Sequence, residues 1–183
     1  MNLANRLTVF RILIIPVFLV FLYCQFQYSM LVAAVLFTIA SLTDILDGYV
    51  ARREKKVTVF GKVFDPIADK LLVLTALIAL VEQGELPSWI AIVIIAREIL
   101  ISGFRIVAAG KGEIISASWL GKTKTVLQDV AVIVYLLHDL PLFTWLDRVY
   151  LPQVSIAAAL VFTVWSTIDY FAANKHAFST EDY

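Results

Sequence analysis

Six long apolar segments constrain the fold of this chain more than any other feature. They cover approximately residues 7–24, 30–50, 64–81, 86–109, 119–137 and 150–173. A helix needs about 20 mostly apolar residues to cross the hydrocarbon core of a bilayer. Hydrophobic residues make up 61% of the chain and charged residues 16%, against about 25% charged in soluble domains. We therefore expect an all-α integral membrane protein whose six transmembrane helices form one bundle.

The positions of the basic residues predict the orientation of this bundle. Cytoplasmic connections of membrane proteins carry an excess of lysine and arginine. The two termini and the second and fourth connections contain most of them: Arg6, Arg11, Arg52, Arg53, Lys55, Lys56, Lys62, Lys111, Lys122, Lys124 and Lys175. The opposite connections contain only Arg148. Both termini and the two basic connections are therefore predicted to be cytoplasmic, in a multi-pass protein of the cell membrane.

The first apolar segment follows a basic start, as the core of a signal peptide does. No small-x-small cleavage site follows it, however, and five further apolar segments do. We expect an uncleaved first span and a single transmembrane domain over residues 1–183. The formal net charge is zero, so the chain has no bulk basic field for nucleic acid, and we expect no such partner.

The cysteine and histidine content limits the metal chemistry that the chain can support. Its single cysteine, Cys24, excludes an intramolecular disulfide framework. Its two histidines, His138 and His176, are too few and too far apart in the sequence for a zinc site. Any metal is therefore expected to be a hard cation with oxygen ligands.

Acidic residues cluster around the second connection, in the stretch DILDGYVARREKKVTVFGKVFDPIAD. On a helix, five residues share one face at positions i, i+3, i+4, i+7 and i+8: Asp44, Asp47, Gly48, Ala51 and Arg52. Three more share a face at i, i+4 and i+8: Gly61, Asp65 and Asp69. A turn between the two helices would bring both faces together and converge four carboxylates near the inner membrane boundary.

Four converging carboxylates need positive charge close to them, because like charges and burial each disfavour the ionised form of a carboxyl group. Divalent cations provide it while holding a fixed geometry, and Mg²⁺ or Mn²⁺ prefers carboxylate and phosphate oxygens. A pair of such ions could clamp a pyrophosphate and stabilise the departing oxygen. The glycines and Ala51 would leave room for a nucleotide, and Arg52 could bind its phosphate. The alternatives are interhelical hydrogen bonding by the aspartates or the ion site of a cation-coupled transporter.

The spacing of these eight residues resembles that of the CDP-alcohol phosphotransferases. The pattern of that family is D-x2-D-G-x2-A-R, a spacer of about eight or nine residues, and G-x3-D-x3-D, and the chain matches it without departure. The resemblance extends over nearly the whole chain, and three further segments look like the bacterial phosphatidylglycerophosphate synthases, a branch of the family: NRLTVFR, IAREILISGFR and WLGKTKT. The resemblance implies a transferase that moves the phosphatidyl group of CDP-diacylglycerol to sn-glycerol 3-phosphate in phospholipid biosynthesis. It also implies a homodimer.

The resemblance assigns roles to individual residues. Asp44, Asp47 and Asp65 correspond to metal ligands, and Asp69 corresponds to a residue that both touches the metal and accepts the proton of the acceptor hydroxyl. A further set corresponds to the site of the CDP-linked lipid: Thr8, Asp47, Gly48, Arg52, Thr58 and Gly61. Thr58 falls in the variable spacer, and Thr8 could instead cap the start of a helix.

An acceptor that carries its own phosphate needs cations outside this motif. Arg105, Lys122 and Lys124 lie near the predicted cytoplasmic side and could converge on an anionic head group, or could simply be positive-inside charge. Arg97 lies deeper and could serve the acceptor or balance a motif carboxylate.

The other polar residues inside the apolar segments are expected to have structural roles. Arg97 and Glu98 are adjacent, and adjacent residues point apart on a helix, so we expect Glu98 to pair with a basic residue on another helix. Gln128, Asp129 and Asp169 are expected to form interhelical hydrogen bonds.

Two other functions remain open from the sequence. The same chemistry could use another acceptor, namely inositol or its phosphate, serine, or phosphatidylglycerol. A cation-coupled transporter is disfavoured, because transporter sites tend toward the midplane of the bilayer and this motif lies at one boundary.

Overall fold

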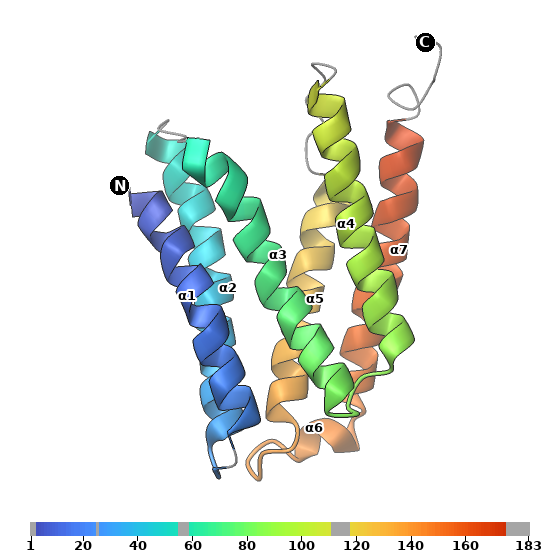
Figure 1. The fold of residues 1–183 in the computed structure, drawn as a ribbon. Helices are drawn as coiled ribbons and strands as arrows, with labels where there is room; N and C mark the ends of the chain where they lie inside the picture. The colour runs from blue at the N-terminus through green and yellow to red at the C-terminus, as the bar shows by residue number, and fades with distance from the viewer. Residues whose placement is uncertain (1–2, 25, 55–58, 111–117, 175–183) are drawn as a thin grey trace.

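The described part of the chain is entirely α-helical. The computed structural model describes residues 3–24, 26–54, 59–110 and 118–174. Seven helices follow in order: α1 (Leu3–Tyr23), α2 (Ser29–Glu54), α3 (Val59–Glu82), α4 (Ser88–Gly110), α5 (Trp119–Leu137), α6 (Trp145–Arg148) and α7 (Leu151–Ala173), as Figure 1 shows.

Six of these helices correspond to the six apolar segments, which confirms the helical part of the prediction. The short α6 between α5 and α7 was not expected. Two helices extend well beyond the apolar runs, because α2 continues to Glu54 and α3 already begins at Val59. The added turns of α2 contain arginine and glutamate, which favour helix, and no proline interrupts them.

Consecutive long helices run in opposite directions. Figure 1 shows that α2 finishes and α3 begins at the same end of the bundle as the start of α1 and the last residues of α4 and α7. We call this end, where α2 reaches Glu54 and α3 starts at Val59, the motif end. The other end holds the short helix α6, and we call it the α6 end.

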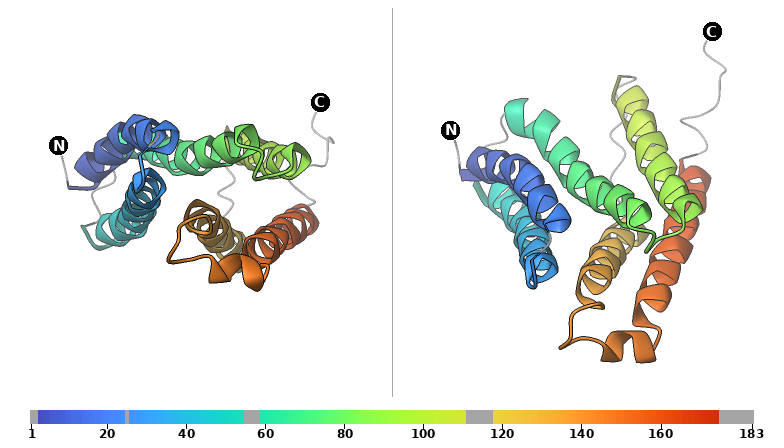
Figure 2. Two further views of the ribbon diagram at one scale, coloured as in Figure 1. Left: turned by 90° about the horizontal axis from the view of Figure 1, so that it is seen from below. Right: turned by 60° about the horizontal axis from the view of Figure 1, so that its bottom comes forward.

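The helices form two groups joined through α3 and α5. Helix α1 packs against α2 and α3, and α7 packs against α4 and α5. Figure 2, viewed from the α6 end, shows α3 and α5 between the α1–α2 pair and the α4–α7 pair. Helix α5 also contacts α2 and α3, so the two groups share a continuous interior.

Small residues let the first two helices approach closely. Ala33, Phe37 and Ala40 follow i, i+4 and i+7 along α2, and all three are completely buried. The ring of Phe37 lies 5.9 Å from that of Phe18 on α1, centroid to centroid. Alanines beside a large aromatic pair are typical of helix interfaces in membranes, where packing contributes much of the association energy.

The outer surface of the bundle is apolar, whereas part of its interior is polar. Large hydrophobic side chains are exposed on all the long helices, including Leu13, Val35, Ile78, Ile99, Val126 and Val161. Completely buried positions include Thr8, Arg11, Thr163 and Ser166. Water would favour the reverse distribution, so this arrangement favours lipid around the bundle.

One described helix meets the length and composition needed to cross a membrane. Helix α7, Leu151–Ala173, has 23 residues and a mean hydropathy of 1.6. Two further apolar helical stretches, Leu7–Tyr23 and Ser29–Thr43, are shorter. The structure thus supports an all-helical protein with a membrane-spanning helix, while the number of spans stays a prediction.

The packing of α1 against α2 makes a direct prediction. Replacing Ala33, which is completely buried, with leucine should lower the free energy of unfolding by about 1–3 kcal/mol, because the added side chain overpacks the interface. Thermal unfolding of the purified protein in detergent measures the effect. The control is Val35→Leu on the same helix, at a side chain that is 49% exposed. Equal stability of the two variants would contradict the close packing described here.

Candidate active site

The motif aspartates occupy two neighbouring helices at one end of the bundle. Asp44 and Asp47 lie in the second half of α2, and Asp65 and Asp69 lie in the first half of α3. The two helices contact each other and are separated in the chain by residues 55–58. The backbone therefore brings both pairs of aspartates toward the motif end, while the convergence of their carboxylates stays a prediction.

The side chains of several predicted site residues are not described. They belong to Asp44, Asp47, Arg52, Asp65 and Asp69, and Thr58 lies outside the described residues. Gly48 and Gly61 are placed on α2 and α3 by their backbone. The helical backbone places Gly48 on the face of Asp44 and Asp47, and Gly61 on that of Asp65 and Asp69.

Helix α1 adds two buried polar residues to this end of the bundle. Thr8 and Arg11 are both completely buried, three residues apart and therefore on one face of α1. Because α1 begins at Leu3, Thr8 is inside the helix, and the alternative of a helix-start cap is wrong. Arg11 was interpreted from the sequence only as positive-inside charge. Its burial among α1, α2 and α3 suits a counter-charge for acidic residues.

Arg97 lies between α4 and α7. Its Nη2 donates to Ser166 Oγ at 3.1 Å and its Nε donates to Thr167 Oγ1 at 3.3 Å. Its Nη1 also forms an ion pair with Glu98 Oε1 at 3.1 Å. These contacts anchor Arg97 within the bundle.

Glu98 joins two cations from different helices. Lys124 of α5, only 2% exposed, donates to Glu98 Oε1, which confirms that Glu98 pairs with a basic residue of another helix. The expectation that Arg97 and Glu98 would not pair with each other was wrong. Their Cβ atoms diverge, but the long arginine side chain reaches around the helix, since burial penalises any charge left alone.

A third polar contact connects this network to the motif. Lys70 directly follows Asp69 on α3, and its Nζ donates to Ser102 Oγ of α4. Ser102 Oγ in turn donates to the carbonyl of Glu98 at 2.5 Å. Gln128 of α5 donates to Thr163 Oγ1 of α7 at 3.1 Å, which is the interhelical hydrogen bond expected of it. Polar contacts thus link α3, α4, α5 and α7.

The four predicted acceptor cations differ in accessibility. Lys124 is buried, the side chain of Arg97 is 11% exposed, and both are engaged with Glu98. Lys122 is exposed, one turn from the start of α5. Arg105 is partly exposed, and its guanidinium carbon lies 5.8 Å from the centroid of the Tyr170 ring. Arg105 and Lys122 are therefore the two with surface open to a ligand.

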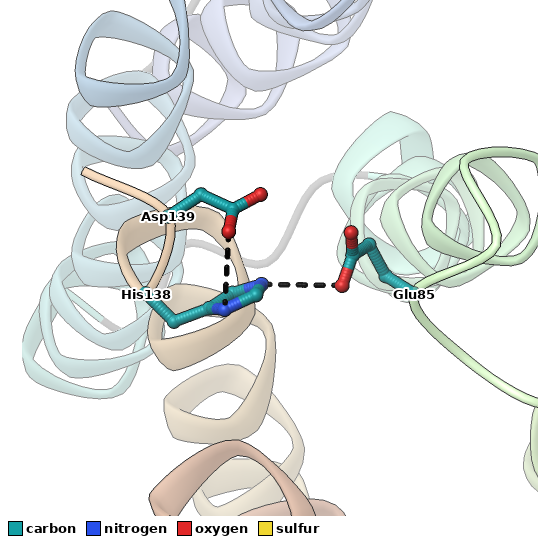
Figure 3. Close-up of side chains that lie close together, drawn as sticks. All are labelled: Glu85, His138 and Asp139. Carbon is teal, nitrogen blue, oxygen red and sulfur yellow. Dashed lines mark ion pairs between the residues drawn. The ribbon is translucent and has the colours of Figure 1, made fainter. Parts of the chain in front are cut away.

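A second group of potential metal ligands lies at the α6 end, far from the motif. Figure 3 shows Glu85, His138 and Asp139, whose ligand atoms lie within 4.8 Å of one another. His138 Nε2 lies 3.2 Å from Glu85 Oε2, and its Nδ1 lies 3.1 Å from Asp147 Oδ1 and 3.6 Å from Asp139 Oδ1. No local pattern predicts this group, because Glu85 is distant in the chain and only folding brings it to His138.

The donor sets at the two ends favour different chemistry. The carboxylates of the motif match the oxygen ligands that Mg²⁺ and Mn²⁺ prefer. At the α6 end, each ring nitrogen of His138 already lies within 3.2 Å of a carboxylate oxygen, so these side chains contact one another without an ion. The motif end is therefore the better candidate for a divalent-ion site.

Comparisons with known proteins identify the family of the chain. The family model for CDP-alcohol phosphatidyltransferases matches residues 1–165. A CDP-diacylglycerol--glycerol-3-phosphate 3-phosphatidyltransferase of Bacillus subtilis (strain 168) is 43% identical and covers 99% of each chain. Proteins of the same name from Salmonella typhimurium and Shigella flexneri serotype 5b are 38% and 37% identical and cover 95% of each chain. A match over nearly the whole length leaves one conclusion: the chain belongs to the CDP-alcohol phosphatidyltransferase family.

Proposed function

We propose that this enzyme transfers the phosphatidyl group of CDP-diacylglycerol to sn-glycerol 3-phosphate, giving phosphatidylglycerophosphate and CMP. The observation that supports the proposal is the complete aspartate motif, whose residues belong to the neighbouring helices α2 and α3. The names of relatives that match nearly the full chain support the choice of both substrates.

Asp44, Asp47, Asp65 and Asp69 are the proposed ligands of two divalent ions, Mg²⁺ or Mn²⁺. Bound there, such ions would supply charge neutralisation for the pyrophosphate of the CDP-linked lipid and for its leaving phosphate. The aspartates hold the ions through hard oxygen ligands, and Arg11 provides a buried positive charge on the neighbouring helix.

Asp69 is the proposed general base. It removes the proton of the acceptor hydroxyl, whose oxygen forms a bond to the lipid-side phosphorus. The bond between that phosphorus and the oxygen of the cytidylyl phosphate breaks, and CMP departs with that oxygen. Lys70, the neighbour of Asp69, donates to Ser102 and so fixes this part of α3 against α4.

The CDP-linked lipid is proposed to bind Thr8, Asp47, Gly48, Arg52, Thr58 and Gly61. The burial of Thr8 in the interior supports its place in such a pocket. Gly48 and Gly61 would admit the nucleotide because they have no side chain.

Arg105, Lys122, Lys124 and Arg97 are the proposed cations for the acceptor phosphate. Arg105 and Lys122 suit direct contact, because they are accessible. Lys124 and Arg97 would act from the buried network around Glu98.

The chain is proposed to cross the cell membrane six times as a single domain, with both termini and the active site cytoplasmic. The exposed apolar side chains on all the long helices support lipid contact around the bundle. The basic residues 52, 53, 62 and 122 lie on described helices near the motif end, which supports a cytoplasmic placement of that end. We further propose a homodimer, as in the family that the motif resembles.

The role of Asp69 has a direct test. Asp69→Asn should reduce CMP release from CDP-diacylglycerol and sn-glycerol 3-phosphate by at least about 10²-fold, because an amide cannot accept the hydroxyl proton. Asp139→Asn is the matched control, since its side chain is 71% exposed at the α6 end. Near-normal turnover by a folded Asp69→Asn protein would refute the assignment of the base.

The two acidic groups predict different responses to metal removal. A chelator should abolish CMP release, and Mg²⁺ or Mn²⁺ should restore it, because the motif carboxylates need the ions to bind the pyrophosphate. His138→Ala, which disrupts the group at the α6 end, should keep the same metal dependence. Full activity in the presence of chelator would contradict the metal assignment, and loss of metal dependence in His138→Ala would place the essential ion at the α6 end.

Kinetics with acceptor-site variants distinguish glycerol 3-phosphate from other alcohols. Arg105→Ala and Lys122→Ala should each raise the KM for sn-glycerol 3-phosphate about tenfold, because each removes a charged contact to phosphate. Arg148→Ala, an exposed arginine at the α6 end, should leave that KM unchanged. A panel of alcohols that includes inositol, serine and phosphatidylglycerol completes the test. Unchanged KM values together with faster turnover of another alcohol would favour the alternative acceptor.

A further inference from the structure

A buried histidine at the α6 end lies among more carboxylates than it can neutralise. His138 follows the last residue of α5 and is 8% exposed. Glu85, Asp139 and Asp147 each place a carboxylate oxygen within 3.6 Å of its ring, and Figure 3 shows two of them on different sides of it. One imidazole carries at most one positive charge, whereas three ionised carboxylates carry three negative charges. Among the described residues, no lysine or arginine forms an ion pair with these three acids.

Two of the carboxylates lie against the same ring nitrogen. His138 Nδ1 is 3.1 Å from Asp147 Oδ1 and 3.6 Å from Asp139 Oδ1. A ring nitrogen carries at most one hydrogen, and 3.6 Å is too long for a hydrogen bond, so hydrogen bonding to Nδ1 accounts for Asp147 alone. Two ligand atoms of a tetrahedral zinc ion, each bound at about 2.0–2.2 Å, lie about 3.3–3.6 Å apart. The spacing of these three atoms therefore suits an ion that binds all of them.

The other ring nitrogen has the surroundings of a metal-binding histidine. A histidine that binds a metal usually donates its second ring N–H to a carboxylate, which fixes its tautomer and the orientation of its ring. His138 Nε2 lies 3.2 Å from Glu85 Oε2. A hydrogen on Nε2, donated to Glu85, leaves the lone pair of Nδ1 available on the side of Asp139 and Asp147.

The group combines a histidine held by packing with acids that water can reach. The backbone N–H of His138 donates to the carbonyl of Val134 at 3.0 Å. The imidazole also packs edge to face against Tyr135, at 5.9 Å between ring centroids. The side chains of Asp139 and Asp147, in contrast, are 71% and 47% exposed. Packing thus orients the nitrogen ligand in advance, and the exposed acids give an ion access from water.

We propose that His138, Asp139 and Asp147 bind Zn²⁺ or a similar divalent transition-metal ion at the α6 end, with Glu85 orienting the histidine. One imidazole nitrogen and two carboxylates suit such an ion, and water can fill the fourth position, whereas Mg²⁺ prefers oxygen ligands alone. The two histidines of the sequence predict no zinc site, but this site needs only one of them because folding supplies the acids.

The proposed ion has a structural role that is separate from the reaction at the motif end. It joins His138 at the end of α5 to Asp147 of α6, and through Glu85 this group contacts the α3–α4 connection. Binding to the folded state alone stabilises it by mass action. The ion should therefore raise the stability of the bundle without changing the metal requirement of catalysis.

The test is Zn²⁺ binding by the full chain in detergent, after treatment with a chelator and with Mg²⁺ in excess. Calorimetric titration should show a Zn²⁺ site that Mg²⁺ does not occupy, and Zn²⁺ at about 100 times its Kd should raise the Tm by about 5 °C. Glu85→Gln should weaken Zn²⁺ binding about tenfold, because it alters the partner that orients the histidine. Asp139→Asn and Asp147→Asn should each weaken it at least as much, since each removes a charged ligand at an exposed position.

Three control variants should keep the Zn²⁺ site. Glu82→Gln removes an acid from the same end of α3, where Glu82 accepts from the hydroxyl of Tyr23. His176→Gln removes the other histidine of the chain. Asp69→Asn removes an acid of the motif, so its Zn²⁺ binding distinguishes the two ends of the bundle.

The possible results decide the proposal. Absence of Zn²⁺ binding by the wild-type protein, or equal affinity in wild type and Asp139→Asn, overturns it. Loss of the site in His176→Gln or Asp69→Asn also overturns it and places the ion elsewhere. Because none of these measurements uses CMP release, they stand independently of the proposed function.

Discussion

Compensation of charge inside an apolar bundle is the constraint on which the rest of this structure depends. A buried ion without a partner is strongly destabilising in a medium of low dielectric constant. Glu98 meets this requirement by accepting from Lys124 and Arg97, and Arg97 extends the network to the hydroxyls of α7. The same contacts hold α4, α5 and α7 in register. The polar interior therefore supports the helix packing and at the same time limits which cations remain available to a ligand.

The two ends of the bundle use charged groups in different ways. At the motif end, the backbone gathers an acidic motif beside the buried Thr8 and Arg11 of α1, and accessible cations follow on α4 and α5. At the α6 end, His138 lies between Glu85 and Asp147 and links the end of α5 to the α3–α4 connection and to α6. The first arrangement leaves groups that suit phosphates and divalent ions, whereas the polar side chains of the second already contact one another. This asymmetry supports a single reaction centre at the motif end.

Much of the fold was predictable because its signals are local. The six long helices follow from the apolar runs, and the shared faces of the motif residues follow from helical spacing alone. Three features were not predictable from local patterns: the pairing of Arg97 with Glu98, the approach of Glu85 to His138 and the complete burial of Arg11. Each depends on how far a long side chain reaches or on which helices pack together. The spacing of residues within one helical segment predicts neither.

The sequence by itself determined the helices, their alternating course and the motif that identifies the family, because run length and spacing act within a single helix or between chain neighbours. Tertiary structure decided which polar residues are already satisfied and which are not. Arg97 and Arg105 are equivalent in the sequence pattern of α4, yet one meets Ser166 and Thr167 whereas the other meets the ring of Tyr170. The facing helix α7 makes this difference, since the partner of a buried group is set by the helix packed against it.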